Sequence, residues 1–409
     1  MNRVVVTGIG AVTPVGNDVP TFWQNLLAGK NGVGFITKFD TNDCKVTIAA
    51  EVKDFDPAAY MDKSDIRKTD LYAQYAMAAA TQAMDDSGIL GKVDPERLGV
   101  YIGSGIGGMS TMIRECGKLF DVGPKRISPF YIPMMISNIA AGNVAIKYNA
   151  QGPSMSIATA CATSANTLGE AYRAILHGYA DAMIAGGSEA TINPLAVGGF
   201  TNCQALSTTN DPDCASIPFD KRRDGFVMGE GGAILILEEY EHAKQRGAKI
   251  YGEICGYGNT NDAYHMTAPH PEATGITNAI KLAVKEAGIP TDAKLYINAH
   301  GTSTPLNDKT ETIAFKKALG EHAHTALISS TKSMTGHMLG ATGAAEAIVC
   351  LLALQNGIVP PTIGYKEPDP ECDLDYVPNT ARKAELDFAL STNLGFGGHN
   401  ACLAFKKAE

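Results

Sequence analysis

The order of strands and helices along the chain is the feature that most restricts its fold. Short β-branched segments that end at glycine or turn residues alternate with segments in which small and apolar residues recur at helical spacing. The expected strands are residues 3–8, 98–105, 181–190, 232–240, 249–258, 294–301, 325–333 and 401–407, and the expected helices include residues 70–88, 276–288 and 342–357. Regular alternation of this kind predicts an α/β protein with parallel or mixed sheets.

The chain also contains two pairs of similar segments. Residues 83–105 and 282–303 each contain a helix end followed by Gly-Ile, and then a strand that ends at Gly-Ser or Gly-Thr. Residues 162–178 and 341–357 have the same length, begin with Ala-Thr and end with Gly. Because the two pairs occur in the same order, we predict a duplicated α/β unit.

The junction of the two units is expected near "EEYEHAKQRGAK", so the chain divides into residues 1–248 and 249–409. The first half is longer, and its excess falls around residues 109–150, where we expect a dimer contact or a substrate cap. The length agrees with a double unit, since one compact core seldom serves 409 residues.

Composition excludes several classes of function. The net charge of −9 argues against general nucleic-acid binding. Nine cysteines occur without a CxxC pair or regular spacing, which predicts neither a zinc site nor a disulfide framework. The first residues lead almost directly into a strand, and no uninterrupted apolar run reaches the length that crosses a bilayer. We therefore expect a cytoplasmic protein without membrane insertion.

Cys161 stands in "SIATACATSANTLGEA", between an expected strand and a helix built from small residues. A thiol at a helix N-terminus feels the positive end of the helix dipole, which predicts a lowered pKa. The first N–H groups of such a helix also point to where an oxyanion would form. A buried structural cysteine is the alternative. The small residues around Cys161 leave room for an extended substrate, which favours a nucleophile.

Further polar residues stand at strand ends. His300 ends a strand in "YINAHGTSTPLND", and "SSTKSMTGHMLGATGAAEA" supplies Lys332 and His337. The glycines of "NLGFGGHN", around Phe396, suit a tight turn that presents a backbone N–H. A G-x-G-x-x-G pattern at residues 103–108 lacks a ribose-binding carboxylate, so a close-packed turn is the better interpretation than a dinucleotide site.

Together these motifs resemble the β-ketoacyl-acyl carrier protein synthases of fatty-acid synthesis, and the elongating type II enzymes (KAS II) most closely. The block "IPFDKRRDGFVMGEGG" is also typical of that family. The pattern Cys–His–His differs from the initiating synthases, and Phe396 stands where thiolases have a second cysteine. The resemblance implies a duplicated five-layered α-β-α-β-α thiolase-like fold that works as a homodimer.

The resemblance also implies a role for each motif. Cys161 would hold the acyl chain, and His300 and His337 would stabilise the enolate that forms when malonyl-acyl carrier protein loses CO2. The N–H groups of Cys161 and Phe396 would form the oxyanion hole. Lys332 and Glu346 would support the histidines as a buried ion pair.

Substrate contacts follow from the same resemblance. The residues implied for the acyl chain and the phosphopantetheine arm are Ile106, Phe200, Thr302, Thr304 and Phe396. Those implied for docking of the acyl carrier protein are Lys63, Arg67, Lys68, Lys125 and Arg126. No metal and no cofactor is expected beyond the 4'-phosphopantetheine that the carrier brings. Because Thr392 and Leu394 depart from the family pattern, a monovalent-cation site near Asn298, Glu346 and Ser391 is not carried over.

Two alternatives remain open at the level of sequence. A free-standing polyketide-type ketosynthase would use the same chemistry on another chain. A non-catalytic chain-length partner would keep the fold but lose the nucleophile, and Cys161 is present.

Overall fold

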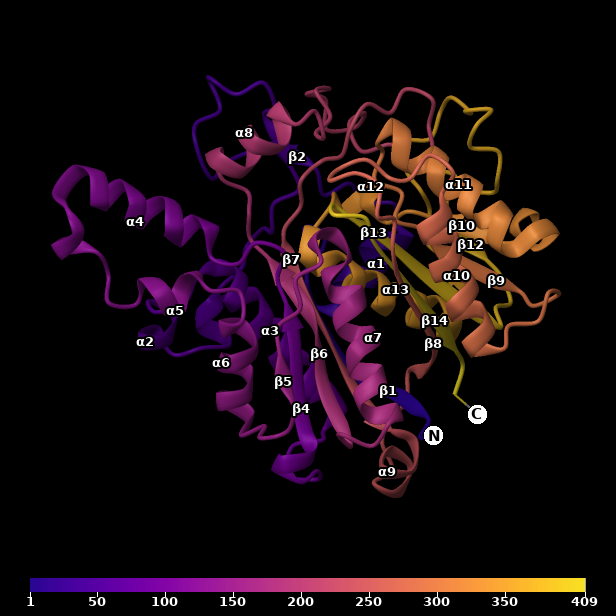
Figure 1. The fold of residues 1–409 in the computed structure, drawn as a ribbon, viewed down its shortest axis with the longest axis horizontal. Helices are drawn as coiled ribbons and strands as arrows, with labels where there is room; N and C mark the ends of the chain where they lie inside the picture. Colours follow the sequence, from indigo (N-terminus) through magenta and orange to yellow (C-terminus); the bar gives the residue numbers. More distant parts are fainter. Residues whose placement is uncertain (409) are drawn as a thin grey trace.

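A mixed sheet of ten strands runs through the computed structural model, which describes residues 1–408 (Figure 1). Its strand order is β10-β9-β13-β14-β8-β1-β7-β6-β4-β5. The strands of the first half are β1 (Val4–Val12), β4 (Leu98–Gly103), β5 (Ser154–Met155), β6 (Ala182–Glu189) and β7 (Gly231–Glu239). Those of the second half are β8 (Gly252–Asn261), β9 (Leu295–Asn298), β10 (Leu327–Ser329), β13 (Phe388–Gly395) and β14 (His399–Lys406).

The two halves of the sheet have the same topology. In the first half β5, β4 and β6 are parallel, and β7 and β1 follow as antiparallel strands. In the second half β10, β9 and β13 are parallel, and β14 and β8 follow in the same antiparallel manner. A short antiparallel pairing of β1 with β8 joins the halves. This repeat confirms the duplicated α/β unit, and the expected boundary at residue 248 falls between α9 (Tyr240–Gln245) and β8.

Helices form the remaining layers. The helices α7 (Thr163–Leu176) and α13 (Thr342–Asn356) pack on each other and on strands of both halves, so they lie between them. The outer face of the first half is covered by α3 (Leu71–Ser87) and α6 (Ile139–Tyr148), and that of the second half by α10 (Thr274–Ala287), beside which α11 (Pro305–Leu319) packs. The expected five-layered α-β-α-β-α fold is therefore confirmed. The paired segments of the sequence are α7 with α13, and the α3–β4 unit with the α10–β9 unit.

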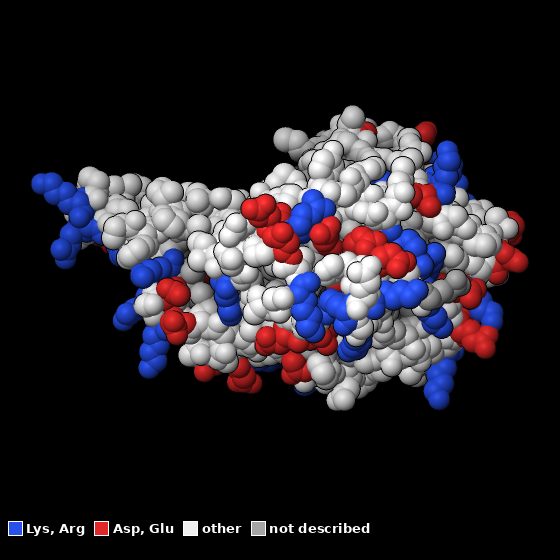
Figure 2. Space-filling model, turned by 90° about the horizontal axis from the view of Figure 1, so that it is seen from below, with Lys and Arg blue, Asp and Glu red and all other residues white. Residues whose placement is uncertain are grey.

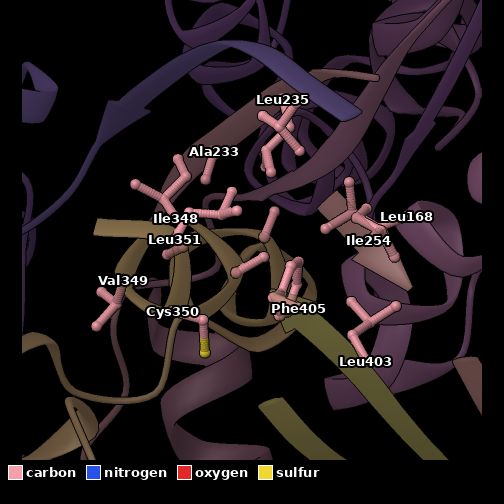
Figure 3. Close-up of a cluster of buried hydrophobic side chains, with 14 of the residues drawn as sticks. Leu168, Ala233, Leu235, Ile254, Ile348, Val349, Cys350, Leu351, Leu403 and Phe405 are labelled. Carbon is pink, nitrogen blue, oxygen red and sulfur yellow. The ribbon is translucent and has the colours of Figure 1, made fainter. Parts of the chain in front are cut away.

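The central helices are buried on nearly every side, which explains their small and apolar residues. Figure 3 shows Ile348 and Leu351 of α13 in one cluster of buried side chains with Leu235 of β7 and Phe405 of β14. Residues Leu339–Asn356 have the length and hydropathy of a membrane span, but 89% of this segment is buried in the protein. It is a core helix, since both of its long sides face sheets.

The additional residues of the first half form α4 (Met109–Val122), α5 (Tyr131–Met135) and α6. Figure 1 shows α4 projecting from the body of the protein as an arm, with α5 at its base. The other helices are α1 (Val19–Leu27), α2 (Lys63–Ile66), α8 (Pro194–Asn202) and α12 (Lys332–Thr335). Two small sheets pair β2 (Gly34–Phe35) with β3 (Ile48–Ala49), and β11 (Ile358–Val359) with β12 (Arg382–Lys383).

Candidate active site

A cavity of about 350 Å³ brings together the residues that the sequence singled out. Cys161, His300, His337 and Phe396 all line it, although they come from four separate segments of the chain. Three of these segments follow or join strands at one edge of the sheet, where the carboxyl ends of parallel strands meet. The cavity therefore places one thiol and two imidazoles within a single small volume.

The thiol stands on a sharp turn that leads into a helix. Cys161 is the middle residue of a 3-10 turn, Ala160–Ala162, and α7 begins at Thr163. Ala160 has a φ of 49°, a left-handed conformation that costs energy for any residue with a Cβ. The expected position at a helix N-terminus is confirmed.

Two backbone N–H groups point at the sulfur. The N–H groups of Phe396 and of Cys161 itself donate toward the Cys161 thiol. This approach depends on Gly395, where an added Cβ would lie 2.4 Å from the Thr159 carbonyl oxygen and 3.3 Å from the Cys161 nitrogen. The pair of donors has the arrangement of an oxyanion hole beside the nucleophile.

The expected low pKa of the thiol is wrong. Burial raises the pKa of the Cys161 thiol to about 12, and the charge of Glu189 adds to this. Lys332 and the two backbone N–H groups lower the pKa, but they do not overcome the desolvation of a thiolate. In the resting protein Cys161 is therefore a neutral thiol, which loses its proton as it attacks.

His300 and His337, the two candidate catalytic histidines, are buried and neutral. Burial, followed by the nearby charge of Lys332, holds the pKa of His300 and of His337 well below its usual range. A neutral imidazole carries a proton on one ring nitrogen only. Nδ1 of His337 lies 3.1 Å from Thr342 Oγ1, whereas its Nε2 has no hydrogen-bond partner. The threonine hydroxyl can donate to Nδ1 and so place the proton of His337 on Nε2.

The backbone around each histidine is also fixed. Glu311 on α11 accepts hydrogen bonds from the N–H groups of His300 (2.6 Å) and Gly301 (2.7 Å). The N–H of His337 donates to the Val227 carbonyl at 2.7 Å. Burial raises the pKa of Glu311 to about 7. Sequence reasoning missed Glu311 and Thr342. Thr342 lies in the same segment as His337, five residues after it, and Glu311 lies eleven residues after His300, just beyond the segment quoted for that histidine.

Lys332 and Glu346 form the expected buried ion pair behind the cavity. Asn393 donates to the other carboxylate oxygen of Glu346 at 2.7 Å. Burial raises the pKa of Glu346 to about 7, while Lys332 opposes this shift. Neither member of the pair lines the cavity, so both act on the site through their charge and their packing.

The side chain of Thr392, which departs from the family pattern, points away from the polar side chains of Ser391 and Asn393. Thr392 points to Glu311, with a hydrogen bond of 2.6 Å, and residues next to it in a strand point the other way. Ser391 Oγ, Asn393 Oδ1 and both polar side-chain atoms of Asn298 are buried without a hydrogen-bond partner.

The proposed substrate contacts are distributed around the cavity. Thr302 and Thr304 line it, with their hydroxyl groups 3.0 Å apart. Phe200 on α8 does not line the cavity, but its ring centroid lies 6.3 Å from that of Phe396, which does. Ile106 is 39% exposed on the loop after β4 and does not line this cavity. Its N–H donates to Glu189, a buried carboxylate that sequence reasoning also missed.

The five basic residues expected at the docking surface are all exposed. Lys63 lies in α2 and Arg67 and Lys68 follow it, while Lys125 and Arg126 form a turn after α4. The Lys68 ammonium lies 5.6 Å from the centroid of the Phe130 ring, which connects the first cluster to the segment after the second. Figure 2 shows Lys and Arg side chains at the end of the molecule that carries the projecting arm.

Comparison with known proteins agrees with this geometry. Residues 1–243 match the model of the β-ketoacyl synthase N-terminal domain, and residues 251–366 match that of the C-terminal domain. A 3-oxoacyl-[acyl-carrier-protein] synthase 2 from Synechocystis is 52% identical over all of this chain and 98% of its own length. Another from Coxiella burnetii is 53% identical over 99% of this chain and 98% of its own.

Solved structures share the fold over their full length. A β-ketoacyl synthase from Burkholderia phymatum has a TM-score of 0.93 and 36% identity, with 100% of both chains covered. A type II polyketide ketosynthase, in complex with its acyl-carrier protein and bound to the hexaketide, has a TM-score of 0.92 and 38% identity over 100% of both chains. The chain therefore belongs to the β-ketoacyl synthase family and is a condensing acyltransferase of fatty-acid synthesis.

Proposed function

We propose that Cys161, His300 and His337 carry out the decarboxylative condensation of an elongating β-ketoacyl-[acyl carrier protein] synthase II. The observation that supports this assignment is the cavity itself, in which one thiol faces two neutral imidazoles and two backbone N–H groups. A thiol can hold an acyl group, and neutral imidazoles can donate to an oxygen that gains negative charge.

The first step transfers the acyl chain. The Cys161 sulfur attacks the thioester carbonyl of an acyl-acyl carrier protein, and the carrier thiolate departs with the proton that Cys161 gives up. The N–H groups of Cys161 and Phe396 stabilise the oxyanion of the tetrahedral intermediate. Since one thioester replaces another, little free energy is lost.

The second step joins the carbon atoms. Malonyl-acyl carrier protein enters, its carboxylate leaves as CO2, and the electron pair moves into an enolate whose oxygen accepts hydrogen bonds from His300 and His337. The enolate carbon attacks the acyl-Cys161 carbonyl, the cysteine thiolate leaves and takes up a proton, and the product is a β-ketoacyl thioester two carbons longer. Lys332 and Glu346 support the histidines from behind as a buried ion pair.

The substrate arm needs no resident cofactor, because 4'-phosphopantetheine arrives on the carrier protein. Thr302 and Thr304 are suited to form hydrogen bonds with its amides. Phe200 and Phe396 are suited to gate the path to Cys161. Ile106, on the loop after β4, would border an acyl chain that extends beyond the cavity described above. An acidic carrier fits the exposed basic residues Lys63, Arg67, Lys68, Lys125 and Arg126, none of which pairs with an acidic residue within residues 1–408.

A homodimer and a cytoplasmic location complete the proposal. The short strand β5 leaves one edge of the ten-stranded sheet unpaired, and Met155 on it is 47% exposed. Ile132 and Ile146 are also exposed, so a second copy of the chain would cover apolar surface and a sheet edge together. All nine cysteines are free, which suits a reducing compartment.

A condensation assay tests the proposal. The protein is incubated with a long-chain acyl-acyl carrier protein and [14C]malonyl-acyl carrier protein, and wild type is compared with Cys161→Ala. Labelled β-ketoacyl product is expected from wild type only, with decarboxylation at most from the variant. An acyl adduct that mass spectrometry finds on a residue other than Cys161 would refute the assignment.

A polyketide-type ketosynthase was the alternative that the sequence left open, and a polyketide enzyme is among the solved structures with a TM-score above 0.9. The higher identity to the fatty-acid enzymes, 52% and 53% against 38%, favours fatty-acid synthesis. The presence of Cys161 in the cavity argues against a non-catalytic chain-length partner.

A further inference from the structure

The segment "IPFDKRRDGFVMGEGG", residues 217–232, connects two parts of the active site. At one end the N–H of Ile217 donates to Ser303 Oγ at 3.0 Å, and the N–H of Gly225 donates to the Ser303 carbonyl at 3.0 Å. At the other end Val227 and Gly229 exchange backbone hydrogen bonds of 2.7 and 2.8 Å with His337. This segment therefore touches the threonine loop, residues 302–305, and a catalytic histidine at once.

Arg223 makes the main side-chain contact between this segment and the threonine loop. Its side chain is only 4% exposed. Nε donates to the Thr304 carbonyl at 3.4 Å, and one terminal nitrogen donates to the Pro305 carbonyl at 3.2 Å. The other terminal nitrogen donates to the Asp220 carbonyl at 3.0 Å and to Asp369 at 2.6 Å. Each nitrogen of the guanidinium group thus has a partner.

The threonine loop needs this support because its backbone is strained. Ser303 has a φ of 67°, in the left-handed region that residues with a Cβ adopt at a cost. A strained conformation persists only where the surroundings hold it. Thr302 and Thr304, on either side of Ser303, both face the cavity, so a relaxation at Ser303 would move both hydroxyl groups.

We propose that Arg223 is a positioning residue, which acts on the pantetheine arm by holding the threonine loop in its strained conformation. This inference rests on the proposed contact of Thr302 and Thr304 with the arm. Lysine cannot replace arginine here, because one ammonium group cannot donate at the same time to the Thr304, Pro305 and Asp220 carbonyls, which the separate nitrogens of the guanidinium group reach. Loss of a charged hydrogen bond to a buried carbonyl commonly changes an equilibrium by about tenfold or more.

The test compares two substrates with and without the arm. The KM for malonyl-acyl carrier protein and the KM for malonyl ethyl thioester, which lacks both amides of the arm, are measured for wild type, Arg223→Lys and Arg223→Gln. Arg222→Lys is the matched control, since Arg222 is paired with Asp220 and the Gly364 carbonyl and has no hydrogen bond to the threonine loop. Iodoacetamide labelling of Cys161 counts the intact active sites in each preparation.

We expect both Arg223 variants to raise the KM for malonyl-acyl carrier protein about tenfold or more. The KM for the truncated thioester should stay within about threefold of the wild-type value in both Arg223 variants. In the Arg222 control the KM values for both substrates should stay within the same range, which is smaller than the effect of losing one charged hydrogen bond. A variant that merely unfolds in part would lower kcat in proportion to the labelled sites and leave KM unchanged. An unchanged KM for the carrier substrate, or an equal rise for both substrates, would overturn the inference.

Thr302→Val and Thr304→Val separate this inference from the function on which it rests. If these variants raise the carrier KM and the Arg223 variants do not, only the role of Arg223 is wrong. If the Arg223 variants raise it and the threonine variants do not, the threonine contact with the arm is wrong, and the inference falls with it.

Discussion

The imidazole rings of His300 and His337 stand nearly perpendicular, at 88°, with their centroids 5.2 Å apart. They follow β9 and β10, which are parallel neighbours in the sheet. Because the carboxyl ends of parallel neighbours meet at one edge, residues 37 positions apart in the sequence come to line the same cavity. Their edge-to-face geometry lets both rings direct a nitrogen toward the cavity.

Removal of either histidine should separate the two chemical steps. His300→Ala or His337→Ala removes one donor to the enolate oxygen, which commonly costs about 2.7–4 kcal/mol, or roughly 10²–10³-fold in rate. Release of CO2 from malonyl-acyl carrier protein measures that loss. Transfer of the acyl chain to Cys161, followed by mass spectrometry, should stay within about tenfold of wild type, as it does not need the enolate. Equal loss in both assays would contradict these roles.

The two buried rings should make the protein sensitive to acid. Both have a folded-state pKa well below 6.5, so the unfolded chain binds more protons once the pH falls below 6.5. Their contribution to stability is complete above that pH and is lost as the pH falls. Each ring can remove up to about 1.4 kcal/mol of the free energy of unfolding per pH unit. Urea unfolding between pH 7.5 and 5.5 measures this slope.

The matched protein for that measurement is the double variant His300→Gln, His337→Gln. Raised carboxyl pKa values elsewhere act in the opposite direction, and the comparison cancels them. We expect the variant to lose less stability than wild type on acidification. Identical slopes would contradict the prediction, because they would show that the rings titrate with the same pKa in the folded and the unfolded chain.

The raised pKa of Cys161 predicts the pH profile of its alkylation. A thiol with a pKa of about 12 should react with iodoacetamide at a rate that rises about tenfold per pH unit up to pH 9, since only the thiolate reacts. Peptide mass spectrometry must follow Cys161 separately, because Cys203 is exposed and lines the same cavity. A plateau below pH 8 would mean that the thiol ionises easily despite its burial.

Gly395 should be indispensable for the oxyanion hole. In Gly395→Ala the new Cβ would lie 2.4 Å from the Thr159 carbonyl oxygen, so the backbone that presents the Phe396 N–H has to move. We expect single-turnover acylation of Cys161 to fall about 10²-fold or more. Gly199→Ala is the control, because nothing lies within 4 Å of its added Cβ in α8. That variant should acylate normally and gain up to about 1 kcal/mol of stability.

Much of the fold and of the site is predictable from local pattern. The alternation of strands and helices indicates the α/β class, and the paired segments indicate the duplication, because the spacing of apolar residues records which faces are buried. Cys161, His300, His337 and the Gly395 turn are also visible, since each follows a strand and lies among small residues that leave room for a substrate.

Other parts of the site depend on side-chain contacts that exist only in the folded chain. Glu311 holds the backbone at His300, Thr342 orients His337, and Arg223 braces the threonine loop, yet none of these pairings can be read from spacing along the chain. The ionisation of Cys161 is a similar case. The helix N-terminus is a local property and favours a thiolate, but the depth at which the sulfur is buried depends on the packing of both halves and outweighs it.

The sequence by itself thus determined which elements form, that they form twice, and which groups are capable of the chemistry. The tertiary structure alone decided which of those groups meet, which protonation states they hold and what supports them. The physical reason is that periodicity and turn preference are properties of neighbouring residues, whereas hydrogen bonding and desolvation depend on distances across the folded chain.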